Sequence, residues 1–230
     1  ALLLAACTPK VAFVRIPKGE FLMGEPGSQH RVTISKAFEM SATEVTQRQW
    51  QEVMGTNPSA FPNPDAPVEQ VTWNEVQEFL RRTKTRLPTE AEWEYACRAG
   101  TRTAYHTGDA LPPDAANYDR QSTTPVASFP PNAWGLYDMH GNVWEWCADE
   151  YCPYPKDAVR DPFQRCGSPY KVIRGGSWHF GPDSARSALR YTHEPHLRGF
   201  SIGFRVIRSR SAATPVAALV PERRLSPPHS

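Results

Sequence analysis

Two stretches of this chain combine residue types that suit metal or substrate chemistry, residues 135–146 (GLYDMHGNVWEW) and residues 174–178 (RGGSW). The first places two carboxylates, Asp138 and Glu145, on either side of a turn glycine, Gly141. Carboxylates and carbonyls from one glycine-containing loop are hard oxygen donors, and binding of a hard cation is one interpretation of this loop. The alternative is structural: Asp138 is a turn residue, and Glu145 accepts hydrogen bonds from buried amides.

Three histidines in the C-terminal part of the chain, His179, His193 and His196, are the residues best suited to a redox metal. Imidazole is a ligand for iron, copper and zinc. The pattern His-x-x-His is loose, however, and loop histidines at the surface match it without binding a metal. The sequence leaves both interpretations of these histidines open.

Short strands and three capped helices are expected to position these residues. Apolar runs bounded by glycines and a Pro-Gly turn predict strands at 11–16, 19–24, 31–34 and 38–40. A threonine followed three residues later by Glu or Gln forms a capping box, which predicts helices at 46–54, 73–82 and 90–99. After Gly100 the chain is expected to be mostly loop, with further strands at 172–174 and 202–207.

The order and spacing of seven motifs resemble the sulfatase-modifying-factor family, whose founding member is the formylglycine-generating enzyme. Besides RGGSW and the 135–146 stretch, the motifs are GEFLMG (19–24), EVT (44–46), PVEQVTW (67–73), RLPTEAEWEYA (86–96) and GFR (203–205). The resemblance extends over roughly residues 12–208. It implies an α+β fold, the C-type-lectin-like fold of the formylglycine-generating enzyme, rich in irregular loops.

The resemblance also implies metal positions. In the family a loop calcium is held at the positions that match Asp138, Gly141, Val143 and Glu145. A second calcium site would begin at Asn117 and Tyr118, although the loop that follows is shorter here. The two cysteines with which the family's enzyme binds copper fall at Phe180 and Ala185, and neither residue supplies the thiolate that selects Cu(I). Copper is therefore not expected, and enzymatic activity is left open.

Arginine–carboxylate pairs and tryptophans are expected to hold the loops of such a fold together. The arginines are Arg174, Arg186, Arg190 and Arg205, with partners such as Glu92, Glu94 and Glu145. The tryptophans are expected in the core rather than in a ligand cage, at positions 50, 73, 93, 144, 146 and 178.

Length and charge favour one large domain with no nucleic-acid partner, because 230 residues carry a net charge of only +2. The first seven residues, ALLLAAC, resemble the end of a bacterial lipoprotein signal with Cys7 as the lipidated residue. A chance apolar run is the alternative. We expect a protein of the bacterial cell envelope, lipid-anchored in the outer membrane, with its domain at 8–208 and a disordered tail at 209–230.

Four further cysteines allow three disulfide pairings. Cys152 and Cys166 lie in one proline-rich loop, and we prefer this pair, which leaves Cys97 with Cys147. The disulfide of the family's enzyme cannot be copied, because Val206 stands where that enzyme has a cysteine.

Three functional hypotheses follow. The first is a non-catalytic, envelope-anchored module that binds a protein, glycan or small-molecule ligand through Trp178, Phe180, Tyr191, His193, His196 and Phe200. The second is a periplasmic maturation oxidase of the type that acts in siderophore assembly, with a cysteine-independent site. The third is a ligand-binding lipoprotein diversified by a retroelement, because variable proteins of that kind are recoded in the segment that corresponds to residues 179–201.

Overall fold

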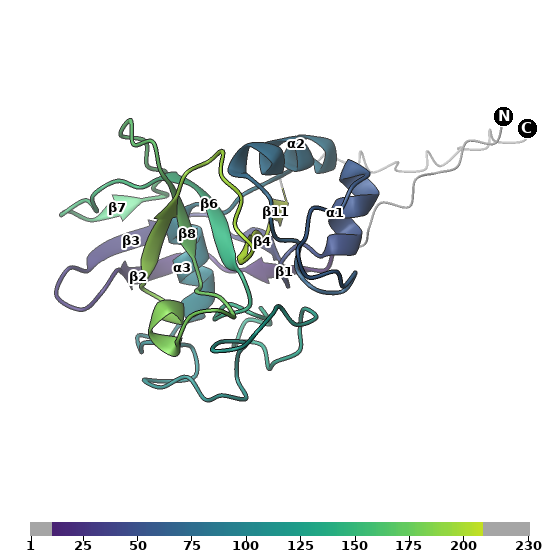
Figure 1. Cartoon of the computed structure of the whole chain (residues 1–230). Coiled ribbons are helices and arrows are strands. Elements are labelled where there is room, and N and C mark those ends of the chain that lie inside the picture. Colours follow the sequence, from purple (N-terminus) through teal and green to yellow (C-terminus); the bar gives the residue numbers. More distant parts are fainter. Residues whose placement is uncertain (1–10, 209–230) are drawn as a thin grey trace, which may run out of the picture.

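Three short helices each begin at a capping threonine in the computed structural model, which describes residues 11–208 (Figure 1). They are α1 (Gln47–Met54), α2 (Trp73–Thr83) and α3 (Glu90–Arg98). The hydroxyl oxygens of Thr46, Thr72 and Thr89 each accept a hydrogen bond from the backbone N–H three residues later, and that residue's side chain accepts one from the threonine N–H. All three predicted capping boxes are confirmed.

Within the described residues 11–208, eleven strands form three small sheets. The first sheet has the order β1 (Phe13–Ile16), β4 (Phe38–Ser41), β11 (Ile207–Arg208), β5 (Thr85–Arg86). The second has the order β10 (Ile202–Gly203), β6 (Trp144–Glu150), β8 (Lys171–Arg174), β9 (Arg190–His193). The third has the order β2 (Gly19–Met23), β3 (His30–Ile34), β7 (Val159–Arg160). Figure 1 shows long loops after α3 gathered below these sheets. The chain is therefore an α+β domain rich in irregular structure, as expected.

The region after Gly100 is more regular than its sequence indicates. The expectation of loop was wrong for β6, a seven-residue strand between β8 and β10. Its residues WEWCADE are buried on both faces, so they lack the polar–apolar alternation by which a half-buried strand is recognised. β7 and β9 were likewise not anticipated, since one has two residues and the other alternates only weakly in burial.

The strand expected at 202–207 is two strands in different sheets. β10 pairs with β6, and β11 pairs with β4 and β5. Between them the chain crosses from one sheet to the other, and its backbone bonds to Val45 and Ser41 rather than to one continuous neighbour. Residues 201–207 are all buried, so the sequence pattern does not indicate where the chain leaves one sheet and enters the other.

Tryptophans fill the two main core clusters, as predicted. Trp93 and Trp146 are fully buried, and Trp50, Trp144 and Trp178 are nearly so. Trp73 is the exception, because it is only partly covered at the start of α2.

The disulfide prediction is confirmed for one pair and wrong for the other. Cys152 and Cys166 are bonded, whereas Cys97 and Cys147 are free and buried. Cys97 lies on α3, where its Sγ is 3.6 Å from the Ser187 hydroxyl, and Cys147 lies on β6, where its Sγ is 3.9 Å from the carbonyl of Glu145. Both thiols lie in one apolar core cluster but contact different polar groups, and the spacing of cysteines in the sequence does not indicate this.

No helix within residues 11–208 is long and apolar enough to cross a membrane. Cys7 and residues 209–230 lie outside the described part of the chain, so the lipid anchor and the disordered tail stay predictions.

Candidate functional site

A tight turn after β8 sets the position of the loop that carries Trp178 and Phe180. Gly175 and Gly176 have φ values of +96° and +73°, which an L-residue with a side chain rarely adopts. A Cβ on Gly176 would also lie 2.8 Å from the Cα of Ala185, so only glycine lets the two segments approach this closely. The N–H of Trp178 then donates to the Asn142 carbonyl at 2.9 Å, which ties the turn to the 135–146 stretch.

A continuous group of aromatic rings lies on the surface beyond this turn. We call it the aromatic surface, and it consists of Trp144, Trp178, His179, Phe180, Tyr191 and Phe200. The ring centroids of Trp178 and Phe200 are 5.7 Å apart, and His179 lies 5.3 Å from Phe180 and 5.6 Å from Phe200. Trp144 joins Phe180 at 6.2 Å to Tyr191 at 5.8 Å.

The outer rings of the aromatic surface face solvent. Phe180 is 46% exposed, Phe200 is 44% exposed and Tyr191 is 61% exposed, whereas Trp144 and Trp178 are buried beneath them. Large rings that stand exposed together on a buried aromatic base are a feature of binding surfaces in soluble proteins.

Four of the six residues predicted to form a ligand-binding surface belong to this group: Trp178, Phe180, Tyr191 and Phe200. The other two do not join it. His193 packs on Trp146 with centroids 5.6 Å apart, and exposed His196 lies 3.4 Å from the carboxylate of Glu194. The prediction missed Trp144 as a base for the surface and assigned His179 to a metal instead. Trp144 is the first residue of β6, whose residues are buried on both faces of the sheet. Its place beneath the exposed rings is set by the pairing of β6 within the sheet and not by a local sequence pattern.

The structure does not bring the three candidate metal histidines together. His179 contacts the rings of the aromatic surface, whereas His193 and His196 contact Trp146 and Glu194. Within residues 11–208, a single group of three His, Cys, Asp or Glu side chains has its ligand atoms within 4.8 Å of one another. That group is Glu150, Cys152 and Cys166, in which the two sulfurs are already joined in the disulfide.

Thiolate chemistry has no accessible group in the described chain. Phe180 and Ala185 occupy the positions at which the resemblance places cysteines, and Ala185 is fully buried against the RGGSW turn. Burial raises the pKa of the Cys97 thiol to about 12, and it raises the pKa of Cys147 well above its ordinary value. Both free cysteines are therefore neutral thiols in the core.

In the predicted calcium loop, the carboxylate of Glu145 is already hydrogen-bonded to other side chains of the chain. Glu145 accepts hydrogen bonds from Arg205, with Nε 2.6 Å from Oε2 and Nη2 2.7 Å from Oε1, and from the Trp93 indole at 2.8 Å. Asp138 accepts one hydrogen bond, from the Ala127 N–H at 2.7 Å, through Oδ2. The residues therefore fit a calcium ion only in part, because Glu145 is bonded to Arg205 whereas Asp138 keeps one oxygen unengaged.

A buried network connects this loop to the position of the second predicted calcium site. The side-chain amide of Asn117 donates to Asn142 at 3.1 Å, and that of Asn142 donates to Glu44 at 3.0 Å. The Asn117 side-chain oxygen is buried without a hydrogen-bond partner. The Tyr118 hydroxyl points elsewhere and donates to the carbonyl of Leu111.

Acidic groups outnumber basic groups around this network. Glu44, Asp138 and Glu145 are all buried, and the basic side chain among them, Arg205, is bonded to Glu145. Burial, together with the neighbouring Asp138 and Glu145, raises the pKa of Glu44 well above its ordinary value, and burial raises the pKa of Asp138 to about 6. Glu44 was not foreseen, because it follows β4 far from the loop in sequence.

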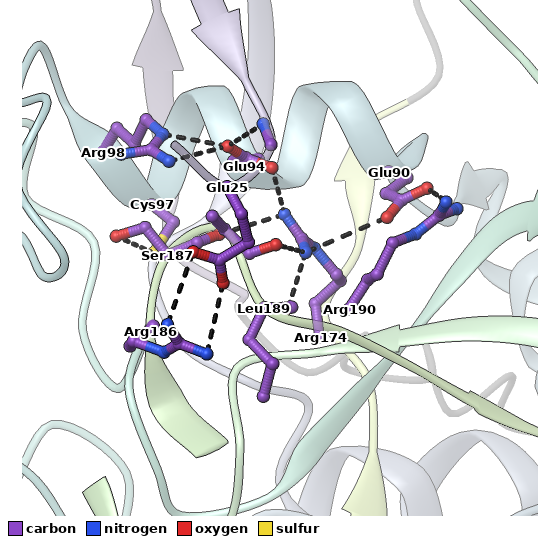
Figure 2. Close-up of polar contacts among 12 residues, drawn as sticks. Glu25, Glu90, Glu94, Cys97, Arg98, Arg174, Arg186, Ser187, Leu189 and Arg190 are labelled. Atoms are coloured by element: carbon purple, nitrogen blue, oxygen red, sulfur yellow. Dashed lines mark hydrogen bonds and ion pairs between the residues drawn. The ribbon is translucent and has the colours of Figure 1, made fainter. Parts of the chain in front are cut away.

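Arginine–glutamate pairs join α3 to the strands β8 and β9, as Figure 2 shows. Arg174 on β8 is fully buried and pairs with Glu94, which also binds Arg98 at 2.9 Å. Arg190 on β9 binds Glu90 at 2.6 Å. Of the carboxylates expected as partners, Glu94 pairs with Arg174 and Glu145 with Arg205, whereas Glu92 pairs with Arg86 instead of with one of the four predicted arginines. Arg186 reaches Glu25 at 3.3 Å.

Comparison with known proteins agrees with this architecture. Residues 5–210 match the model of the family described as the sulfatase-modifying factor enzyme 1-like domain. The formylglycine-generating enzyme of Streptomyces coelicolor is 34% identical over 178 residues, which cover 68% of this chain and 57% of that enzyme.

Two solved structures match over most of their length. PvdO from Pseudomonas aeruginosa has a TM-score of 0.77 at 30% identity, and the match covers 89% of this chain and 97% of that one. Treponema denticola variable protein 1 has a TM-score of 0.78 at 26% identity, with 86% of this chain and 95% of that one covered. The chain spans between 23% and 62% of the length of seven curated relatives that it matches. The family model covers all of the described residues, and the chain belongs to the sulfatase-modifying-factor family with the fold of the formylglycine-generating enzyme.

Proposed function

We propose that this chain is an envelope-anchored binding or accessory module that takes a protein, glycan or small-molecule ligand on its aromatic surface and does not generate formylglycine. The exposed rings of Phe180, Tyr191 and Phe200 on their buried base are the observation that carries the proposal. Such rings offer a large apolar contact area and lose little conformational entropy on binding.

The exclusion of formylglycine generation rests on the side chains at the relevant positions. Phe180 and Ala185 have no metal-binding atom, and the free thiols of Cys97 and Cys147 are buried and neutral. A soft thiolate pair for Cu(I) is therefore lacking among residues 11–208. Copper has no part in the proposal.

Three further features belong to the proposal. A lipid anchor at Cys7 would hold the module at the outer membrane, and nucleic acid is not a partner because the net charge is only +2. A calcium ion bound near Asp138 would offset the surplus of buried carboxylates around Arg205. Asp138, which accepts a hydrogen bond from Ala127 through Oδ2, would supply a carboxylate oxygen there, and the partnerless side-chain oxygen of Asn117 belongs to the second predicted calcium position.

Ligand capture by the intact chain tests the proposal. The wild type and a triple variant, Phe180→Ala with Tyr191→Ala and Phe200→Ala, are compared for binding to a glycan array and to detergent-extracted envelope proteins. We expect the triple variant to lose about tenfold or more in affinity, because the exposed rings supply the contact. A matched control replaces Tyr170, which is 43% exposed away from the aromatic surface, with Ala and keeps its binding.

A cysteine-containing sulfatase peptide incubated with the protein, copper and oxygen provides the opposing test. Conversion of its cysteine to formylglycine would contradict the proposal outright. If the wild type and the triple variant bind the ligand equally and have equal melting temperatures, the aromatic surface is not the binding site.

A second candidate function is ligand binding by a surface that a retroelement diversifies. The similarity to Treponema denticola variable protein 1 favours it, and so does the exposure of Phe180, Tyr191 and Phe200 within the segment 179–201. Sequencing the gene across isolates tests it: variation concentrated at the exposed positions of that segment supports it, and uniform conservation rejects it. The similarity to PvdO keeps the maturation oxidase as a further alternative, for which stoichiometric iron or copper in the purified protein would be the positive result.

A further inference from the structure

A groove of about 640 Å³ lies between α2, β5 and the loop that contains Phe163. It involves none of the residues of the aromatic surface. Grooves of this volume that combine an apolar floor with a few polar groups at the rim are the usual sites for small ligands.

Leucine, alanine and aromatic side chains line much of the groove, together with the polar residues Gln77, Thr85 and Thr89. Leu80 from α2 and Leu87 after β5 are buried at its base, and Ala148 of β6 lies beside them. Two aromatic rings border it, Trp73 at the start of α2 and Phe163, which is 47% exposed.

Trp73 is held in one orientation. Its indole N–H donates to the Cys147 carbonyl at 3.0 Å, and the Lys171 ammonium lies 4.5 Å from the centre of its ring. A fixed aromatic wall of this kind loses no conformational entropy when an apolar ligand packs on it.

The rim of the groove is positively charged. Arg81, Lys84 and Arg86 line it with a single carboxylate, that of Glu92, which Arg86 already binds through both of its oxygens. Arg81 is held by Glu78, and that carboxylate also binds Arg82, so the last turn of α2 keeps a surplus of positive charge. Lys84 is exposed, and its ammonium group has no hydrogen-bond or ion-pair partner within residues 11–208, whereas its backbone N–H donates to the Leu80 carbonyl at the end of α2.

We propose that this groove binds an amphiphilic carboxylate, a ligand with an unbranched apolar body and one carboxyl group. The body lies between Trp73 and Phe163 on the leucine floor, and the carboxylate faces Lys84. The cationic residues select the sign of the head group, and Leu80, Leu87, Ala148 and the two aromatic rings offer contact to an apolar body. The site is separate from the aromatic surface and adds a second ligand to the module.

Calorimetric titration of the full chain with dodecanoate below its micelle concentration tests the proposal. We expect saturable binding, and we expect dodecylammonium to bind at least about tenfold more weakly because its charge is repelled at the rim. Lys84→Glu should weaken dodecanoate binding by about tenfold without lowering the melting temperature, since Lys84 is exposed. Phe163→Ala should weaken both ligands.

Two matched variants complete the experiment. Lys18→Glu changes the same charge outside the groove, and Tyr191→Ala alters the aromatic surface, so both should bind dodecanoate as the wild type does. The proposal is overturned if dodecanoate does not bind, if dodecylammonium binds equally well, or if Lys84→Glu and Lys18→Glu have the same effect. These results do not test the aromatic surface, because that surface is tested with the triple variant against glycans and envelope proteins, whereas the groove is tested with dodecanoate.

Discussion

Three buried carboxyl groups, those of Glu44, Asp138 and Glu145, lie near the single guanidinium of Arg205. Glu145 obtains two hydrogen bonds from Arg205, whereas Asp138 has one from a backbone N–H and Glu44 lies among their negative charges. A carboxyl group that is more easily protonated in the folded state makes the fold less stable as the pH rises through its pKa.

Asp138→Asn should flatten the pH dependence of stability. In the wild type the folded pKa of Asp138 is about 6, above the ordinary 3.8, so its contribution to stability is lost as the pH rises between these values. In the presence of chelator, the wild type should lose on the order of 1–2 kcal/mol more than the variant between about pH 5 and about pH 8. Urea unfolding at the two pH values measures this, and Asn suits the left-handed conformation of the position.

If calcium binds at Asp138, it should stabilise the wild type but not the Asp138→Asn variant. Added calcium should then raise the melting temperature of the wild type at about pH 8 and leave that of Asp138→Asn unchanged, since the variant lacks the ligand charge. A wild type whose melting temperature is the same in calcium and in chelator would rule out the calcium prediction.

Trp146→Ala should destabilise the domain by about 3–5 kcal/mol, the usual cost of truncating a buried tryptophan. The side chain of Trp146 is fully buried, and its indole N–H donates to the Val71 carbonyl at 3.1 Å. Tyr191→Ala is the comparison, because that ring is mostly exposed and its loss should cost less than about 1 kcal/mol. Similar denaturation midpoints for the two variants would contradict the burial of Trp146.

Strand β6 and the loop that follows it connect the two sites. β6 supplies Trp144 to the aromatic surface and Ala148 to the groove, and its middle residues lie in the core. The Cys152–Cys166 disulfide begins two residues after this strand and closes the loop that carries Phe163. The groove therefore depends on a loop that a covalent bond restrains.

Replacing both cysteines, Cys152→Ala with Cys166→Ala, should lower stability by about 3 kcal/mol, as expected for opening a loop of about 15 residues. The sequence separation of the pair is 14. A reducing agent should have the same effect on the wild type and none on the double variant, because Cys97 and Cys147 form no disulfide. Denaturant unfolding with and without reductant makes the comparison, and reductant sensitivity of the double variant would show that another disulfide exists.

The domain as a whole has a group of exposed aromatic rings, a separate groove with a cationic rim, and a net charge of only +2. Such a surface is suited to ligands captured by shape and apolar contact rather than by long-range electrostatic attraction. A lipid anchor ahead of the first strand would keep both sites at the membrane surface.

Cys7→Ser should move the protein from the membrane fraction to the soluble fraction when the gene is expressed in its own host. The hydroxyl cannot form the thioether to diacylglycerol, and stable anchoring needs more than one acyl chain. Immunoblotting of separated membrane and soluble fractions provides the measurement. An unchanged distribution would refute the lipidation of Cys7.

Local features were readable directly from the chain. The three capping boxes, the N-terminal strands, the Cys152–Cys166 pair and the family motifs each depend on residues close together in sequence, so their physical cause is contained in a short window. The arginine–glutamate pairs were anticipated in kind, because a buried guanidinium requires a carboxylate, but only two of their partners were identified.

Long-range packing decided the remainder. β6 is buried on both faces and carries no alternation, Glu44 meets Asn142 across 98 positions of sequence, and the rings of Trp144 and Phe180 meet only after β8 turns back. The groove arises where α2, β5 and the disulfide loop come together. Residue type and spacing set what each side chain can do, whereas its partners, and hence its charge state and exposure, are set by segments distant in sequence that only the folded chain brings into contact.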